Sequence, residues 1–301
     1  MTPSPASFLD SAVISRLLAL PLNARQAMTG SVSGRHRSPV RGSSVEFAQY
    51  RKYVPGDDTR RLDWRTWGRT DRFYIKEFEA DTNLRLALIV DASGSMGYGP
   101  DGATRLDYCR KLGGTLGWLA AHQGDAVGLW GVGKDHRQKL PAKRGAVHLK
   151  LVLDQLAGLE AKGETTILEA MHQAADQISQ RALVVVVSDF FIEPVKLKQA
   201  LQHLRFRRHD VALFQVLDAV ELDFTFDRPA RFVDMEGGET LLADPPLIAR
   251  RYQEVVKKYL AEMDEAVRTT GVDYQRVMMK EPFEDVLARF LLARLQSKGR
   301  R

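Results

Sequence analysis

The sequence predicts an α/β protein with a doubly wound, mostly parallel sheet flanked by helices. From residue 84 onward, short runs of apolar and β-branched residues alternate with segments in which apolar residues recur every three or four positions. The first pattern indicates buried strands, and the second indicates amphipathic helices. Because a helix separates most pairs of strands, we expect parallel pairing with right-handed crossovers.

Each element of this region follows from its own pattern. The predicted strands cover residues 84–90, 126–132, 183–189, 210–218 and 273–279. The predicted helices cover residues 106–119, 147–157, 167–178, 195–207 and 245–269, with a last one starting near 282. Residues 230–244 read as a hairpin that turns at Gly237 and Gly238, since paired turn residues between apolar runs favour a tight connection.

The first 80 residues differ from the rest of the chain in composition and periodicity. Apolar residues at helical spacing predict a helix within residues 7–28, whereas residues 30–80 are rich in Gly, Ser, Arg and aromatic side chains. We interpret the latter as short strands and ordered turns that end in a strand near residues 72–80. We therefore expect two domains: residues 1–80, a helix plus a β-rich arm, and residues 81–301, the α/β domain with a C-terminal extension.

Composition sets the broad class. The chain has 301 residues, of which 44% are hydrophobic and 27% charged, as in ordinary globular proteins. No stretch approaches the roughly 18 to 20 apolar residues that span a bilayer. The single cysteine, Cys109, excludes an internal disulfide and fits a reducing compartment. We expect a cytoplasmic protein without a transmembrane segment.

Positive charge gathers near the N-terminus. Residues 34–72 hold ten Arg or Lys against five acidic residues, within a chain of net charge +6. Such a segment is able to face nucleic acid or an anionic surface. The other interpretation is a solvated face in which arginines pair with the interleaved aspartates.

Oxygen-bearing side chains follow the predicted strands. Asp91, Ser93 and Ser95 come directly after the first strand, and Asp189 ends the strand rich in valine. Thr165 and Thr166 lie in a glycine-containing loop before a helix. In open α/β sheets, ligands bind at the carboxyl ends of the strands. Two carboxylates and three hydroxyls, without His or Cys, suit a hard divalent cation such as Mg²⁺ or Mn²⁺.

The two threonines leave one assignment open. Thr166 and Glu169 have the spacing of a capping box, which predicts that Thr166 serves the helix start and Thr165 the cation. Thr166 remains the alternative ligand.

The D-x-S-x-S run resembles the metal-ion-dependent adhesion site of von Willebrand factor A domains. That resemblance implies a von Willebrand factor A-like fold, with Mg²⁺ bound directly by Ser93 and Ser95. It implies that the cation's remaining protein ligands, direct or through water, are Asp91, Thr165 and Asp189.

A second stretch precedes this domain. Residues 45–79 are similar to the bacterial domain of unknown function 58 family, whose R-x-Y-x-x-G-D-D-x-R-x-x-D-W motif occurs here as Arg51, Tyr53, Gly56, Asp57, Asp58, Arg60, Asp63 and Trp64. From the residues alone, this motif serves either local structure or partner contact. The resemblance implies a partnership with MoxR-type AAA+ ATPases.

We therefore expect a non-enzymatic, metal-dependent protein-interaction module that works with a MoxR-type AAA+ ATPase in a chaperone-like or regulatory assembly. Its partner would offer an acidic residue to the cation. The alternative is nucleic-acid or anionic-surface binding through residues 34–72. A Mg²⁺-dependent hydrolase is less favoured, because the predicted loops supply no histidine base, D-x-D pair or phosphate-binding loop.

Overall fold

The computed structural model describes residues 8–22, 46–54, 62–70, 72–79, 84–99, 102–133, 136–238 and 240–298. The chain forms two compact units, a smaller one within residues 26–84 and a larger one that contains the first helix and everything from Arg85 onward. No helix in the described part combines the length and the apolar character needed to cross a bilayer.

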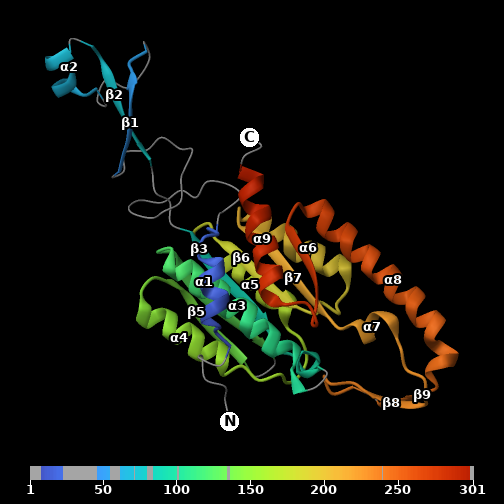
Figure 1. Ribbon diagram of the computed structural model, residues 1–301. Helices are drawn as coiled ribbons and strands as arrows, with labels where there is room; N and C mark the ends of the chain where they lie inside the picture. Colours follow the sequence, from blue (N-terminus) through green and yellow to red (C-terminus); the bar gives the residue numbers. More distant parts are fainter. Residues whose placement is uncertain are drawn as a thin grey trace. The chain divides into compact units, whose positions relative to one another are not determined.

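The larger unit is built on a six-stranded sheet in the order β10-β7-β6-β3-β4-β5 (Figure 1). Every neighbouring pair is parallel except β4 and β5, which are antiparallel. This arrangement confirms the predicted fold class. The strands are β3 (Arg85–Asp91), β4 (Ala126–Gly133), β5 (His136–Lys143), β6 (Leu183–Ser188), β7 (Asp210–Leu217) and β10 (Asp273–Met278).

Helices cover both faces of the sheet (Figure 1). One layer holds α1 (Ser11–Leu17), α3 (Arg105–His122), α4 (Ala146–Ala157) and α9 (Phe283–Lys298). The other layer holds α5 (Ile167–Gln177), α6 (Pro194–Phe206) and α8 (Pro245–Thr270). The short α7 (Ala219–Asp223) and the hairpin of β8 (Ala230–Val233) and β9 (Thr240–Ala243) lie between β7 and α8 in the chain.

Strand β3 is buried on both faces, as its continuous apolar run predicts. Ala87 and Ile89 belong to the core shared with α5, α6 and α8. Leu88 faces α3 at Gly117, where an added Cβ would lie 3.5 Å from Leu88 Cδ1, an ordinary van der Waals contact. The two packed layers fix the end of β3, which carries Asp91.

Two elements differ from the sequence prediction. β5 was not predicted, because it is an antiparallel edge strand with polar residues and Pro141, and proline is tolerated only where a strand has a free edge. Helix α1 is shorter than the predicted 7–28 and packs on α3 and α9. The sequence prediction groups that helix with the arm, but its apolar face, Val13, Ile14 and Leu17, is buried in the larger unit.

The smaller unit pairs β1 (Glu46–Lys52) with β2 (Tyr74–Glu79) in an antiparallel ribbon. A helix that the sequence did not reveal, α2 (Trp64–Thr70), lies between them in the chain. Asp63 caps it, since its Oδ1 accepts hydrogen bonds from the amides of Arg65 and Thr66 at 3.0 and 3.2 Å. Trp67 stacks on Phe73 with ring centroids 5.8 Å apart.

This geometry gives part of the 51–64 motif a local structural role. Asp63 is 6% exposed and Trp64 is 59% exposed. Trp64 meets Trp67 edge to face, so only part of its ring is covered. Arg51 and Tyr53 lie on β1 and at its end, whereas Gly56, Asp57, Asp58 and Arg60 fall outside the described residues.

We predict that His209 makes the folded protein sensitive to acid. The side chain is buried just before β7, and its Nδ1 accepts a hydrogen bond from the amide of Ala182. Burial lowers its pKa to about 4, from an ordinary value near 6.5. As the pH falls, His209 is therefore protonated in the unfolded chain at a higher pH than in the folded chain. The free energy of unfolding decreases between about pH 6.5 and pH 4, by up to about 1.4 kcal/mol per pH unit. Urea unfolding of His209→Gln should show a flatter pH dependence, whereas the exposed control His122→Gln should match wild type. Equal slopes for wild type and His209→Gln would contradict this.

Candidate metal centre

The predicted site residues meet at the carboxyl ends of two neighbouring strands. β3 and β6 pair in parallel with Val90 opposite Val187, so Asp91 and Ser188 follow side by side. The loop before α5 brings Thr165 to the same place, where its Oγ1 donates to Asp91 Oδ2 at 3.1 Å. The structure thus assembles residues that are 74 positions apart in the chain around one carboxylate.

Asp91 is the most deeply placed member of the cluster. Its Oδ1 accepts from the amide of Ser93 at 2.9 Å, and its Oδ2 accepts from the hydroxyl of Ser188 at 2.7 Å. It is 0% exposed, and the pKa of its carboxyl is raised to about 6, first by burial and then by the charge of Asp189. These donors are neutral. A buried carboxylate with neutral partners favours a nearby cation.

The two serines present their hydroxyls to each other. Their Oγ atoms lie 3.2 Å apart, because a 3₁₀ turn over Gly94–Gly97 reverses the chain directly after Ser93. Ser93 is buried and Ser95 is half-buried. The pair therefore lies between the enclosed carboxylate of Asp91 and the outer side of the site.

The structure brings Thr165, and not Thr166, to Asp91. Thr166 is the N-cap residue of α5, but its side chain makes no capping hydrogen bond. The predicted capping box of Thr166 and Glu169 is therefore wrong. The amide of Ile167 instead meets Thr165 Oγ1 at 3.4 Å, so Thr165 serves both the helix start and the cluster.

Asp189 is turned towards an arginine that the sequence analysis did not include. Arg105 Nη1 donates to Asp189 Oδ2 at 2.9 Å and to the carbonyl of Ser95 at 3.1 Å. Arg105 is 1% exposed and also pairs with Glu221. With Oδ2 engaged in this way, Asp189 would serve a cation through Oδ1 or through water.

The backbone beside Asp189 is strained. Phe190, a fully buried non-glycine residue, has φ 53°, a region that costs side chains on the order of 1 kcal/mol or more. Its amide donates to Ser188 Oγ at 2.9 Å, and Tyr259 donates to its carbonyl. The turn that orients Asp189 is thus held by contacts from β6 and α8.

Sequence signals existed for one of the missed residues. Arg105 lies on the helix stripe of Cys109, Leu112 and Leu116, where a charged residue indicates a buried partner. Ser188 gave no comparable signal, because its importance depends on which strands become neighbours.

Comparison with known proteins places the chain in a family. The family model described as "Protein of unknown function DUF58" matches residues 49–262. The chain belongs to the DUF58 family. Its larger unit has a mostly parallel, helix-flanked sheet (Figure 1).

Several proteins are similar to this DUF58 chain over most of its length. "Uncharacterized protein Rv1480" of Mycobacterium tuberculosis is 23% identical over 292 residues, which cover 95% of this chain and 90% of that protein. BatB from Bacteroides thetaiotaomicron matches with a TM-score of 0.48 and 16% identity, over 71% of this chain and all of that one. The SpRpn10 VWA domain matches with a TM-score of 0.43 and 13% identity, over 69% of this chain and 95% of that one.

The donor set of the DUF58 chain fits a hard cation held partly by hydroxyls. Among the described residues, no three His, Cys, Asp or Glu side chains group as metal ligands. The cluster instead combines serine and threonine hydroxyls with the enclosed carboxylate of Asp91. Oxygen donors with few direct anions suit Mg²⁺, which keeps several waters. Metal binding by these five residues stays a prediction.

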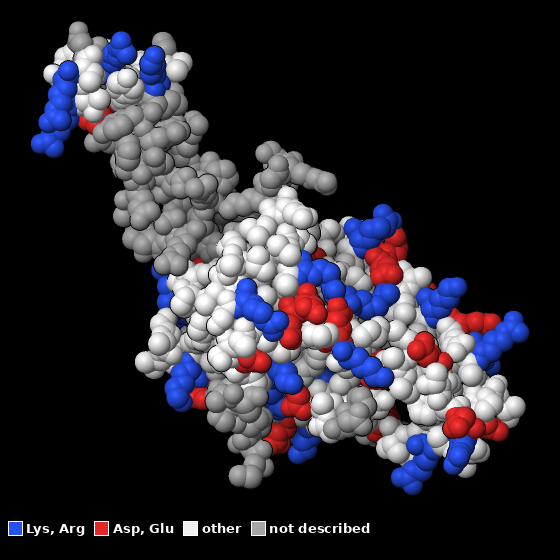
Figure 2. All heavy atoms as spheres, in the orientation of Figure 1, with Lys and Arg blue, Asp and Glu red and all other residues white. Residues whose placement is uncertain are grey.

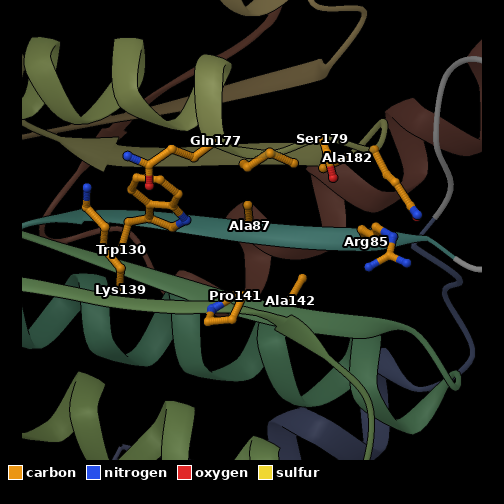
Figure 3. A pocket seen from close by; sticks show the side chains of 11 residues that line it. Arg85, Ala87, Trp130, Lys139, Pro141, Ala142, Gln177, Ser179 and Ala182 are labelled. Carbon is orange, nitrogen blue, oxygen red and sulfur yellow. The ribbon is translucent and has the colours of Figure 1, made fainter.

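A separate cavity opens at the other end of the sheet (Figure 3). It measures about 280 Å³ and is lined by Arg85 and Ala182, at the amino ends of β3 and β6, and by Trp130 and Lys139 farther along the sheet. Lys139 Nζ lies 4.8 Å from the centre of the Trp130 ring. The described residues that line this cavity include no carboxylate, so the DUF58 site at the carboxyl ends is the stronger candidate.

Proposed function

We propose that this DUF58 chain is a non-enzymatic protein-interaction module that uses a bound divalent cation, Mg²⁺ or Mn²⁺. The observation that supports this most is the buried carboxylate of Asp91 beside the paired hydroxyls of Ser93 and Ser95. In this proposal the two serines bind the cation directly. Asp91, Thr165 and Asp189 hold it directly or through its waters.

The partner would supply an acidic residue. A cation with neutral hydroxyl ligands keeps much of its charge, and an outside carboxylate can complete its coordination. The family resemblance leads us to propose a MoxR-type AAA+ ATPase as the partner that carries this residue.

A cavity beside Ser95 offers room for the neighbouring part of the partner. It measures about 340 Å³ and has aromatic walls, formed by Tyr98, Phe191, Phe224, Phe226, Phe232 and Tyr252. Apolar walls with few polar groups are typical of binding pockets. We propose that the partner segment places a large apolar side chain here, next to its acidic residue.

The proposed role is binding and not turnover. A metal-dependent hydrolase needs a base or nucleophile positioned at the cation. Among the described residues, the side chains that hydrogen-bond to the five predicted ligands are hydroxyls, Arg105, other members of the cluster and Glu236, whose carboxylate is engaged by the amide of Thr165. Arg105 is engaged by Asp189 and Glu221, which suits it to a structural role in the site.

Immobilised full-length protein should capture the MoxR-type ATPase encoded in the same genome when Mg²⁺ is present, and lose it with EDTA. Asp91→Ala and the pair Ser93→Ala/Ser95→Ala should reduce capture at least about 10-fold, the lower range seen when metal sites lose supporting groups. The matched control Asp154→Ala, at an aspartate of α4 whose side chain is 40% exposed, should behave as wild type. Undiminished capture in EDTA would contradict the proposal.

The same experiment separates the electrostatic alternative. Figure 2 shows Lys and Arg side chains on the described part of the smaller unit. The exposed basic residues in that part of the sequence include Lys52, Arg65, Arg69 and Arg72. On the visible face of the larger unit, acidic and basic side chains are interspersed. Binding that survives EDTA but falls steeply with salt would favour a polyanion on the smaller unit over the metal-dependent partner.

A further inference from the structure

The β8–β9 hairpin places its turn against the candidate metal centre. The turn joins Val233 to Thr240 and contains Asp234, Met235 and Glu236. The amide of Thr165 donates to Glu236 Oε2 at 3.2 Å. Because the hydroxyl of the same Thr165 donates to Asp91, Glu236 brings a further carboxylate to the border of the cluster.

The hairpin turn touches the serine loop directly. A Cβ built on Gly94, the residue between Ser93 and Ser95, would lie 2.0 Å from the carbonyl oxygen of Met235. Only a glycine permits this approach of two backbones. A Cβ on Gly97 would lie 3.4 Å from the Met235 methyl carbon Cε. The turn therefore lies on the same loop that holds the predicted direct ligands.

The conformation of the turn orients Glu236. The amide of Glu236 donates to Asp234 Oδ1 at 2.8 Å, a local bond that fixes the backbone before the glycines. Gly237 follows with φ 101°, which glycine adopts readily. Glu236 is half-buried, whereas its neighbour Met235 is 46% exposed. The acidic side chain, and not the apolar one, is directed to Thr165.

The charges around the cluster are unbalanced. Asp189 lies close enough for its charge to act on Asp91, and Glu236 accepts from the same Thr165 that donates to Asp91. The buried Arg105 pairs with Asp189 and Glu221. The carboxylates of Asp91 and Glu236 accept from neutral hydroxyl and amide donors. One divalent cation between them would compensate both charges.

We propose that Glu236 is an internal carboxylate of the metal centre, which completes the coordination of the cation directly and closes the site with the hairpin. An acidic residue of a partner must then displace Glu236 to reach the cation. This inference rests on the proposed metal-dependent function. It adds a competitor, built into the chain, that controls when the site accepts an outside carboxylate.

Water proton relaxation with Mn²⁺ tests this assignment on the full chain. Relaxation enhancement reports how much Mn²⁺ is bound and how many exchangeable waters the ion keeps. Glu236→Gln should bind Mn²⁺ about 10-fold more weakly, the size expected when one supporting carboxylate is lost. At saturation it should show a higher relaxivity than wild type, because water replaces the carboxylate. The control Glu160→Gln removes an exposed carboxylate from the loop before Thr165 and should match wild type.

Acetate then serves as the outside carboxylate. It should lower the relaxivity of saturated Glu236→Gln by displacing the extra water, and should change wild type and Glu160→Gln much less. Hydrogen exchange gives a readout independent of relaxivity: Mn²⁺ or Mg²⁺ should slow exchange of the amides in residues 230–243 in wild type, and should do so less in Glu236→Gln.

The outcomes separate the two claims. If wild type binds no Mn²⁺, or binds it equally well after Asp91→Ala, both the metal-dependent function and the role of Glu236 are overturned. If wild type binds Mn²⁺ in an Asp91-dependent manner but Glu236→Gln equals Glu160→Gln in affinity, relaxivity and exchange, only the role of Glu236 is overturned.

Discussion

Asp91→Asn is expected to stabilise the metal-free protein at neutral pH and to abolish its stabilisation by Mg²⁺. Wild-type Asp91 is fully buried, and its pKa is raised to about 6 from 3.8. Its contribution to stability is complete below pH 4 and is lost as the pH rises through 6. At neutral pH the ionised side chain thus costs up to about 3 kcal/mol, the equivalent of about two pKa units. Asparagine keeps the shape and removes this cost.

The same substitution should remove the response to the cation. A cation that binds only the folded protein raises the free energy of unfolding. At Mg²⁺ concentrations well above Kd, this increase grows with the logarithm of the ratio of the Mg²⁺ concentration to Kd. Thermal unfolding with and without Mg²⁺ at pH 7.5 should show a rise in Tm for wild type and none for Asp91→Asn. Asp154→Asn, at a partly exposed aspartate on α4, is the matched control. Two results would contradict the prediction: a metal-free Asp91→Asn protein less stable than wild type, or one that Mg²⁺ still stabilises.

Arg294→Ala is expected to lower the free energy of unfolding by about 3 to 5 kcal/mol. Arg294 on α9 is 1% exposed and bridges Asp210 at the start of β7 and Asp273 at the start of β10. Its guanidinium also lies 5.3 Å from the ring centre of Phe290. Removing it leaves two buried carboxylates without this shared cation, and urea unfolding at pH 7.5 measures the loss.

Two further variants test the cause of this loss. Arg289→Ala removes an arginine of the same helix that is about half exposed and pairs with Glu281, so it should cost less than about 1 kcal/mol. Arg294→Met combined with Asp210→Asn and Asp273→Asn should recover much of the stability, because it removes all three charges together. If the triple variant is no more stable than Arg294→Ala, packing and not charge dominates the stability at this position.

The fold was predictable because the composition of most of its strands shows that both faces of the strand are buried. The run from Leu183 to Val187 contains only apolar residues, as a strand covered on both faces requires, and the structure buries all of it. β5 and α2 were missed for the opposite reason. The strand His136–Lys143 is polar and lies at an edge, and α2 buries none of its described residues. Their conformations depend on pairing partners and on the cap at Asp63, which composition does not reveal.

The candidate site likewise contains residues that the sequence predicted and residues that only the structure revealed. Asp91, Ser93, Ser95 and Asp189 were found because strand ends in a parallel sheet converge, and that convergence follows from strand order alone. The choice between Thr165 and Thr166 was not settled by spacing, since the expected capping box does not form and the loop turns Thr165 to Asp91. Arg105 and Glu236 reach the cluster from a helix start and a hairpin turn.

The sequence by itself determined the doubly wound sheet, its two helical layers and the oxygen-rich strand ends, because periodicity and the D-x-S-x-S spacing act over a few residues. Only the tertiary structure decided which groups surround Asp91, which acid engages Arg105, and that the chain's own Glu236 meets Thr165. Those contacts join segments far apart in the chain. Their energies depend on distance and burial in the folded state, and neither quantity exists before the strands have paired.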